Sequence, residues 1–267
     1  MRAGRRWRRL AGAALVVLGA CSSGHRAAAP AAPSRAAPSP ASSPARSPAP
    51  STGPVVYVAI GASESLGVGS SDPAQDAWPA VFARGFLPHS ATFDNVAVSG
   101  ATVEDALQDQ LSQALAAHPT LVTVWLNVND LIASVTPADY QHELQSLISQ
   151  LRQKGGTTVL VANTPPLDQL PIYLACRSGS FGLGTGSLCP APAALDASVD
   201  AYNRATSAVV ASTGAILVDL HAAGAEAEKD GTYASLVSAD GFHPSDAGYA
   251  LVARTFGAAL QKAAAAS

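Results

Sequence analysis

Short apolar runs alternate with longer stretches of helical periodicity across residues 54–267. The apolar runs predict strands, because each has four to seven residues and most end at turn-forming residues. The runs lie at residues 55–60, 92–98, 121–126, 157–162 and 215–218. Helices are expected between them, at residues 73–86, from Thr102, from Pro137, at residues 193–211 and from Ser245 to about residue 263.

Local signals fix the starts of three of these helices. Thr102 with Asp105 three residues later forms a near capping box, and Thr136 followed by Pro137 gives an N-cap with proline at the first helical position. Ser245 caps the last helix. The helix from Pro137 carries one apolar face, made by Tyr140, Leu144, Leu147, Ile148 and Leu151.

Strands that alternate with helices imply parallel βαβ units. The strands read as continuous apolar runs, which is typical of a sheet covered by helices on both faces. We therefore expect an α/β fold, a three-layer α/β/α sandwich around a five-stranded parallel sheet of flavodoxin-like type. In such open sheets ligands bind at the carboxyl ends of the strands. A long loop is expected over residues 164–190.

The first 53 residues differ from the rest in composition. The chain of 267 residues has a formal net charge of −3, but eight of its sixteen Lys and Arg residues lie in residues 1–53, which contain no Asp or Glu. Residues 54–267 therefore carry a formal charge of −11. A surface of that sign repels nucleic acid, and no basic stripe with interleaved aromatic residues follows residue 54.

Residues 1–20 predict a signal peptide. Five arginines between residues 2 and 9 precede a short apolar stretch, residues 10–20, which is too short for the ~20 residues of a membrane-spanning helix. The stretch ends in Leu-Gly-Ala before Cys21 and resembles the bacterial lipobox, which implies cleavage before Cys21 and its acylation. An ordinary signal peptide with a chance cysteine is the alternative, and the paired arginines are also compatible with twin-arginine export.

Residues 21–53 read as the lipidated cysteine followed by a disordered linker rich in Ala, Pro and Ser. At about 3.1 Å per residue, an extended linker of this kind reaches on the order of 100 Å. We expect an envelope lipoprotein that is anchored to the membrane through Cys21, with its domain outside the cytoplasm. The linker could equally be a passive spacer.

Two further cysteines, Cys176 and Cys189, lie in the long loop. An exported protein meets oxidising conditions, so we expect them to form a disulfide. A zinc site is a poor fit, because no histidine lies near them.

Polar motifs follow the first three predicted strands and precede the last helix. They are Gly-Ala-Ser-Glu-Ser-Leu at residues 61–66, Val-Ser-Gly-Ala-Thr at residues 98–102, Asn-Val-Asn-Asp at residues 127–130, and Asp-Gly-Phe-His-Pro at residues 240–244. The four motifs, in this order, resemble the blocks of the SGNH, or GDSL, hydrolase family. The resemblance covers residues 55–263 and implies a serine esterase of the lipase type.

The resemblance implies a role for five residues. Ser63 matches the nucleophile, His243 the general base, and Asp240 the acid that orients it. The oxyanion hole would comprise the backbone N–H groups of Ser63 and Gly100 and the side-chain amide of Asn129.

The chemistry of these residue types agrees with those roles. A serine hydroxyl needs a base within hydrogen-bonding distance, and histidine suits that task near neutral pH. An aspartate three residues before the histidine can reach its second ring nitrogen and fix the tautomer. No metal or organic cofactor is implied.

Two positions depart from the family pattern. Ala62 stands where the family has Asp, which indicates looser support of the site or another subfamily. Asn127 stands where the family usually has Gly, so we expect a narrower pocket. Taken alone, each motif residue also has a structural interpretation, such as a turn for Ser63 or a helix-flanking position for His243. Asp219 and His221 are interpreted as ordinary loop residues, and Trp125 as core.

Three functions remain open. The first is a serine ester hydrolase that cleaves small acyl esters, such as a glycan O-acetyl group or a lipid or aryl ester. The second is a weak or inactive homologue that binds an acylated or glycan ligand at the cell surface. The third is a non-enzymatic lipoprotein scaffold. We expect a monomer.

Overall fold

The computed structural model describes residues 53–152, 155–179 and 189–266. The predicted signal peptide and almost all of the predicted linker, with Cys21, lie outside the described residues. In the described part of the chain no helix is long and apolar enough to span a membrane.

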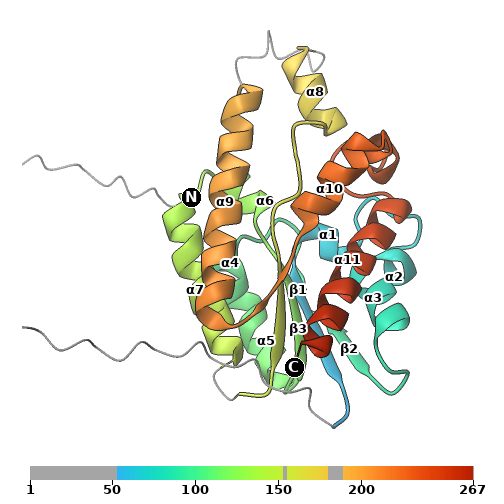
Figure 1. The fold of residues 1–267 in the computed structure, drawn as a ribbon, viewed down its shortest axis with the longest axis vertical. Helices are drawn as coiled ribbons and strands as arrows, with labels where there is room; N and C mark the ends of the chain where they lie inside the picture. Colours follow the sequence, from blue (N-terminus) through green and yellow to red (C-terminus); the bar gives the residue numbers. More distant parts are fainter. Residues whose placement is uncertain (1–52, 153–154, 180–188, 267) are drawn as a thin grey trace, which may run out of the picture. The chain divides into compact units, whose positions relative to one another are not determined.

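A five-stranded, fully parallel sheet forms the centre of the domain (Figure 1). Its order is β2-β1-β3-β4-β5, the flavodoxin-like order, so the predicted fold class is confirmed. The strands are β1 (Val56–Gly61), β2 (Thr92–Asn95), β3 (Leu121–Trp125), β4 (Thr158–Ala162) and β5 (Ile216–Val218). Because β1 lies between β2 and β3, the loops that follow these three strands are neighbours at one edge of the sheet.

Helices cover both faces of the sheet. On one face lie α4 (Val103–Asp105), the π-helical turn η1 (Ala106–Gln110), α5 (Leu111–Ala116), α7 (Pro137–Arg152) and α9 (Pro192–Thr213). On the other lie α3 (Trp78–Phe86) and α11 (Asp246–Ala265), with the start of α10 (Leu220–Lys229) packed beside them. The remaining short helices are α1 (Ser63–Leu66), α2 (Pro73–Asp76), α6 (Val128–Ile132), α8 (Pro171–Arg177) and the 3₁₀ helix η2 (Tyr233–Leu236).

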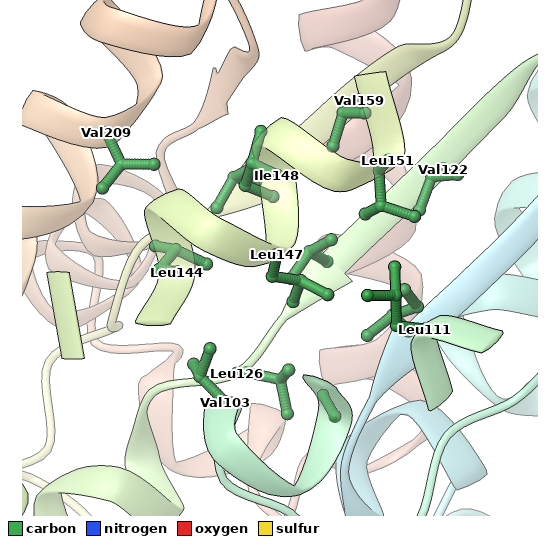
Figure 2. Close-up of a cluster of buried hydrophobic side chains, with 14 of the residues drawn as sticks. Val103, Leu111, Val122, Leu126, Leu144, Leu147, Ile148, Leu151, Val159 and Val209 are labelled. Carbon is green, nitrogen blue, oxygen red and sulfur yellow. The ribbon is translucent and has the colours of Figure 1, made fainter. Parts of the chain in front are cut away.

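The first core forms under α7, whose five predicted apolar residues are all buried (Figure 2). These side chains of α7 pack on Val122 of β3 and Val159 of β4, and on Leu126, which directly follows β3. The second core is rich in aromatic rings, with Trp78 stacked on Phe256 at a centroid distance of 4.2 Å. Trp125 lies in this second core with 5% of its surface exposed, as expected.

The predicted helix starts are confirmed. Thr102 and Asp105 form a reciprocal capping box, and the hydroxyl of Ser245 accepts a hydrogen bond from Gly248 N at 3.3 Å. The predicted helix over residues 73–86 is instead two helices, α2 and α3, because Ala77 has ψ 135° between them.

Other boundaries differ from the predictions. β2 ends at Asn95, three residues early, and is a largely exposed edge strand rather than a run buried on both faces. The predicted loop over residues 164–190 contains α8. Asp219 and His221 are not loop residues, because the carboxylate of Asp219 caps α10 by accepting from Ala222 N at 2.9 Å and His221 lies within that helix.

Candidate active site

Ser63 lies in a tight strand-to-helix turn, at the first residue of α1 directly after β1. The turn requires Gly61, since a Cβ there would lie 2.0 Å from Ser65 Oγ. The amide of Asn95 donates to Ser65 O at 2.7 Å and ties α1 to the end of β2. The position of Ser63 is therefore set by contacts on both sides of the turn.

The side chain of a buried glutamine forms hydrogen bonds to the last residue of β1. Gly61 N donates to Gln110 Oε1 at 3.0 Å, and Gln110 Nε2 donates back to Gly61 O at 3.0 Å. Gln110 has no exposed surface. It was not predicted, because a single glutamine on an amphipathic helix gives no sequence signal for such a contact.

His243 lies in a closed loop between η2 and α11. Ser238 N donates to His243 O at 2.8 Å, and Ser245 N donates to Leu236 O at 2.8 Å, so the chain turns back on itself across the loop. Gly241 has φ 77°, a conformation that favours glycine. The loop is also held from outside, because Ile172 N of α8 donates to Gly241 O at 3.1 Å.

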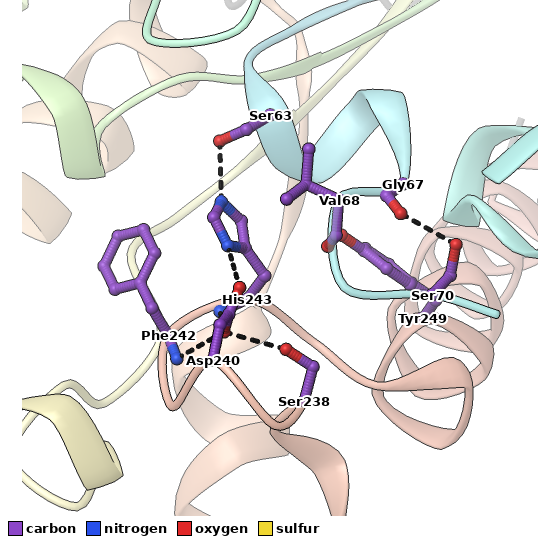
Figure 3. A network of polar contacts seen from close by, with 9 residues as sticks. All are labelled: Ser63, Gly67, Val68, Ser70, Ser238, Asp240, Phe242, His243 and Tyr249. Atoms are coloured by element: carbon purple, nitrogen blue, oxygen red, sulfur yellow. Dashed lines mark hydrogen bonds and ion pairs between the residues drawn. The ribbon is translucent and has the colours of Figure 1, made fainter.

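Ser63, His243 and Asp240 form one hydrogen-bonded chain (Figure 3). His243 Nε2 lies 3.0 Å from Ser63 Oγ, and His243 Nδ1 lies 2.6 Å from Asp240 Oδ2. These are the distances that a serine nucleophile, its base and the orienting acid require. The structure thus brings together residues that are 180 positions apart in the sequence.

The second oxygen of Asp240 accepts three hydrogen bonds, from Phe242 N, His243 N and the Ser238 hydroxyl, at 2.8–2.9 Å. Partial burial opposes the charge, but these bonds and the one from the His243 ring outweigh it and hold the pKa of Asp240 below its ordinary value. The carboxylate therefore stays charged and fixed in orientation. Ser238 was not predicted.

The three predicted oxyanion donors follow β1, β2 and β3. The N–H groups of Ser63 and Gly100 have no hydrogen-bond acceptor among the described residues. Gly100 has φ 81° and open space where a Cβ would stand, so its backbone is accessible to a ligand. Asn129 Nδ2 donates one bond to Ala101 O at 3.1 Å, which leaves its second N–H hydrogen for another acceptor.

Asp130 joins the two loops that carry Gly100 and Asn129. Its Oδ1 accepts from Val103 N at 3.1 Å, and the residue is fully buried. Burial raises the pKa of Asp130 to about 6, although the backbone hydrogen bonds act in the opposite direction. The carboxylate of Asp130 therefore links α6, which carries Asn129, to the start of α4.

Both residues that depart from the family pattern are buried. Ala62 is 2% exposed and belongs to the first core. Asn127 is 2% exposed, and its amide donates toward Ala162 O on β4 at 3.4 Å. The expected narrowing of the pocket by Asn127 is therefore wrong, because its side chain is directed to the sheet.

A disulfide joins Cys176, at the end of α8, to Cys189, as predicted. Their Cα atoms lie 6.2 Å apart, within the usual range for a disulfide. Since α8 hydrogen-bonds to Gly241, the disulfide anchors an element that supports the loop of His243. In the described ranges no cluster of His, Cys, Asp or Glu could hold a metal ion.

Residues 59–251 match the model of the GDSL-like Lipase/Acylhydrolase family. The chain belongs to this family. The match makes it an ester-hydrolysing serine hydrolase. No curated protein matched the sequence.

Solved structures with the same fold include several acylhydrolases. A phospholipase A1 from Streptomyces albidoflavus is 24% identical, with a TM-score of 0.58, over 78% of this chain and all of that one. The protein TesA is 23% identical, with a TM-score of 0.56, over 78% of this chain and 99% of that one. Axe2, an acetyl-xylooligosaccharide esterase from Geobacillus, is 20% identical, with a TM-score of 0.58, over 77% of this chain and 94% of that one. At these identities the similarity shows the fold alone, and it does not indicate the substrate of this protein.

Proposed function

We propose that this protein hydrolyses small acyl esters with Ser63 as nucleophile, His243 as general base and Asp240 as the orienting acid. The observation that supports this assignment most strongly is the continuous chain from Ser63 Oγ through His243 to Asp240, with contacts of 3.0 and 2.6 Å. Histidine in this position can take the serine proton as the hydroxyl attacks.

The reaction proceeds in two steps. Ser63 Oγ attacks the ester carbonyl and gives its proton to His243 Nε2, which then protonates the departing alcohol and leaves an acyl group on Ser63. A water molecule gives a proton to His243 and attacks the acyl-enzyme. The acid product departs, and Ser63 regains its proton. Asp240 stabilises the imidazolium that forms in each step.

In both steps negative charge develops on the former carbonyl oxygen. We assign the N–H groups of Ser63 and Gly100 and the free N–H of Asn129 as its donors. The absence of other acceptors for Ser63 and Gly100 among the described residues favours this role, because their donors need no rearrangement.

The substrate class extends to glycan O-acetyl, lipid or aryl esters. The names of the similar structures span a phospholipase and an acetyl-xylooligosaccharide esterase, so they support an acyl ester without choosing its alcohol. We further propose that the protein is exported and anchored through acylated Cys21 and acts as a monomer at the cell envelope. The basic start, the apolar stretch and the position of Cys21 support export and anchoring.

The proposal is tested by the hydrolysis of p-nitrophenyl acetate and butyrate by the purified protein and by Ser63→Ala. We expect turnover by the wild type that falls to background in the variant. A folded wild type with no turnover above Ser63→Ala on either ester would favour a ligand-binding protein on the hydrolase fold.

A further inference from the structure

An apolar cavity lies next to the loop that carries His243. Its volume is about 90 Å³, well above the ~10–15 Å³ that holds one water-sized group. Trp125, Leu220, Ala223, Leu236 and Leu251 are among the residues that line it. The cavity is close to the candidate active site, because Glu64 follows Ser63 and Phe242 and Pro244 flank His243, and all three line the cavity wall.

A separate groove passes between α6, α8 and α9. Four residues line both the groove and the cavity, namely Val128, Leu167, Leu170 and Phe242. Three of them are buried in one cluster, and Phe242 is only partly buried against it. Phe242 is therefore the member of the shared wall whose side chain has most room to move.

The backbone of Phe242 is fixed while its ring is not hydrogen-bonded. Phe242 N donates to Asp240 Oδ1 at 2.8 Å, so the main chain belongs to the same network as the triad. The ring stands edge-on to His243, with centroids 4.9 Å apart and planes at 87° (Figure 3). The ring therefore belongs to the wall between the groove and the cavity, while its main chain is held by Asp240.

The lining of the cavity selects the chemistry of its occupant. Glu64 is the only ionisable carboxyl on the wall, and burial raises its pKa, which its own backbone and His243 only partly offset. Apart from Glu64 and Tyr233, the residues that line the cavity are apolar or glycine, and an apolar wall disfavours a polar occupant that finds no hydrogen-bond partner. A hydrocarbon chain therefore fits this cavity better than a sugar or a charged group.

We propose that the cavity is the subsite for the distal part of an alkyl chain of the ester substrate, with the ring of Phe242 as the part of its wall that faces the groove. This inference rests on the proposed function, because the chain must belong to an ester held at Ser63. It narrows the substrate to esters with a medium-length alkyl chain, in either the acyl or the alcohol half. Each methylene that leaves water for the cavity should raise kcat/KM about fourfold. Esters whose chain fills the cavity should therefore have a clearly higher kcat/KM than short-chain esters.

The test changes the far wall of the cavity and leaves the triad intact. Ala223→Leu fills the cavity from α10, and Ala222→Leu places the same side chain on the exposed face of that helix as a control. Acyl chains are compared with p-nitrophenyl acetate, butyrate and octanoate, and alcohol chains with ethyl and octyl acetate. We expect Ala223→Leu to lower kcat/KM for the long chain relative to the short one by at least about tenfold in one series, and Ala222→Leu to change neither.

Two further variants should have the opposite effect on kcat/KM for the long chain relative to the short one. Phe242→Ala removes part of the wall shared with the groove and Leu251→Ala enlarges the cavity, so both should raise the ratio of kcat/KM for the long chain to that for the short chain severalfold in the same series. They also cover the case in which Ala223→Leu does not fold. Ratios that stay at the wild-type value in Ala223→Leu, Phe242→Ala and Leu251→Ala would overturn the proposal.

A binding measurement separates this proposal from the proposed function. Trp125 lines the cavity, so the tryptophan fluorescence of the Ser63→Ala protein should change on titration with ethyl octanoate or octyl acetate but not with ethyl acetate. Addition of Ala223→Leu should weaken that binding at least about tenfold. Absent hydrolysis of all esters would refute the function alone. The subsite would be refuted if neither ethyl octanoate nor octyl acetate binds, or if the binding of both is unaffected by Ala223→Leu.

Discussion

Replacement of Gln110 by leucine tests whether a buried hydrogen-bonded pair holds the turn that carries Ser63. Leucine has a similar volume but no polar atoms, so Gly61 N loses the partner at 3.0 Å. Gly61 O loses the bond from Gln110 but keeps the one from Val98 N at 3.2 Å. A buried polar group left without a partner costs about 1–3 kcal/mol, so we expect a total loss of about 2–4 kcal/mol for the N–H and the weakened carbonyl together.

The loss is measured by urea unfolding, with the exposed Gln108→Leu as the control on the same helical segment. A Gln110→Glu variant adds a test of the chemistry. Its carboxylate cannot donate to Gly61 O at neutral pH, whereas the protonated form at acid pH can restore both bonds. We expect Gln110→Glu to be less stable than wild type at pH 7 and to regain part of the difference near pH 4.

The activity should change in parallel, because Gly61 lies two residues before Ser63. We expect kcat of Gln110→Leu to fall below that of Gln108→Leu at a temperature at which both are folded. If the stability of Gln110→Leu lies within ~0.5 kcal/mol of Gln108→Leu, the ordinary range for surface substitutions, the reasoning is refuted.

Three further substitutions test the parts of the site separately. Asp240→Asn should lower kcat by about 10⁴ while the fold persists, since an amide cannot hold His243 in the required tautomer, and a loss under tenfold would contradict the orienting role. Asn129→Ala should lower kcat by about 10²–10³ with little change in KM, and an effect on KM alone would argue against an oxyanion donor. Burial raises the pKa of Asp130 from 3.8 to about 6, so the folded protein holds a proton that the unfolded chain releases. Asp130 should therefore lower the free energy of unfolding by about 2 kcal/mol as the pH rises from about 4 to 6. Asp130→Asn should lose that share in urea unfolding at the two pH values, and an equal pH dependence in both proteins would exclude a raised pKa.

Strong local patterns predicted much of the fold. β1, β3 and β4 are continuous apolar runs, and α7, α9 and α11 have a clear apolar face and a proline or a cap at the start, so their positions were predicted to within about two residues. The prediction of β2 was three residues too long because residues 96–98 are apolar. Val96 N and Val98 N still donate to Ala59 O and Gly61 O of β1, but the strand itself ends at Asn95. α10 was missed because it is short and rich in alanine, and because its cap, Asp219, was assigned to a loop.

The candidate site, too, was predicted from the sequence only in part. Ser63, Asp240 and His243 were predicted from motifs, and the structure brings their side chains into contact. Gln110, Glu64 and Phe242 were not identified, because their importance depends on distant partners and on a cavity. A polar or aromatic residue on a helix or loop has the same local pattern whether it faces solvent or a cavity behind the triad, so sequence periodicity alone cannot separate these cases.

The assignment of Ser63 as the nucleophile is tested most directly by covalent labelling. The protein is treated with an alkyl fluorophosphonate, which reacts with activated serine hydroxyls, and the modified peptide is located by tandem mass spectrometry. We predict one phosphonyl group on Ser63, formed far more slowly in His243→Ala and absent in Ser63→Ala. Stoichiometric labelling of another serine, or no labelling of a folded protein, would contradict the account.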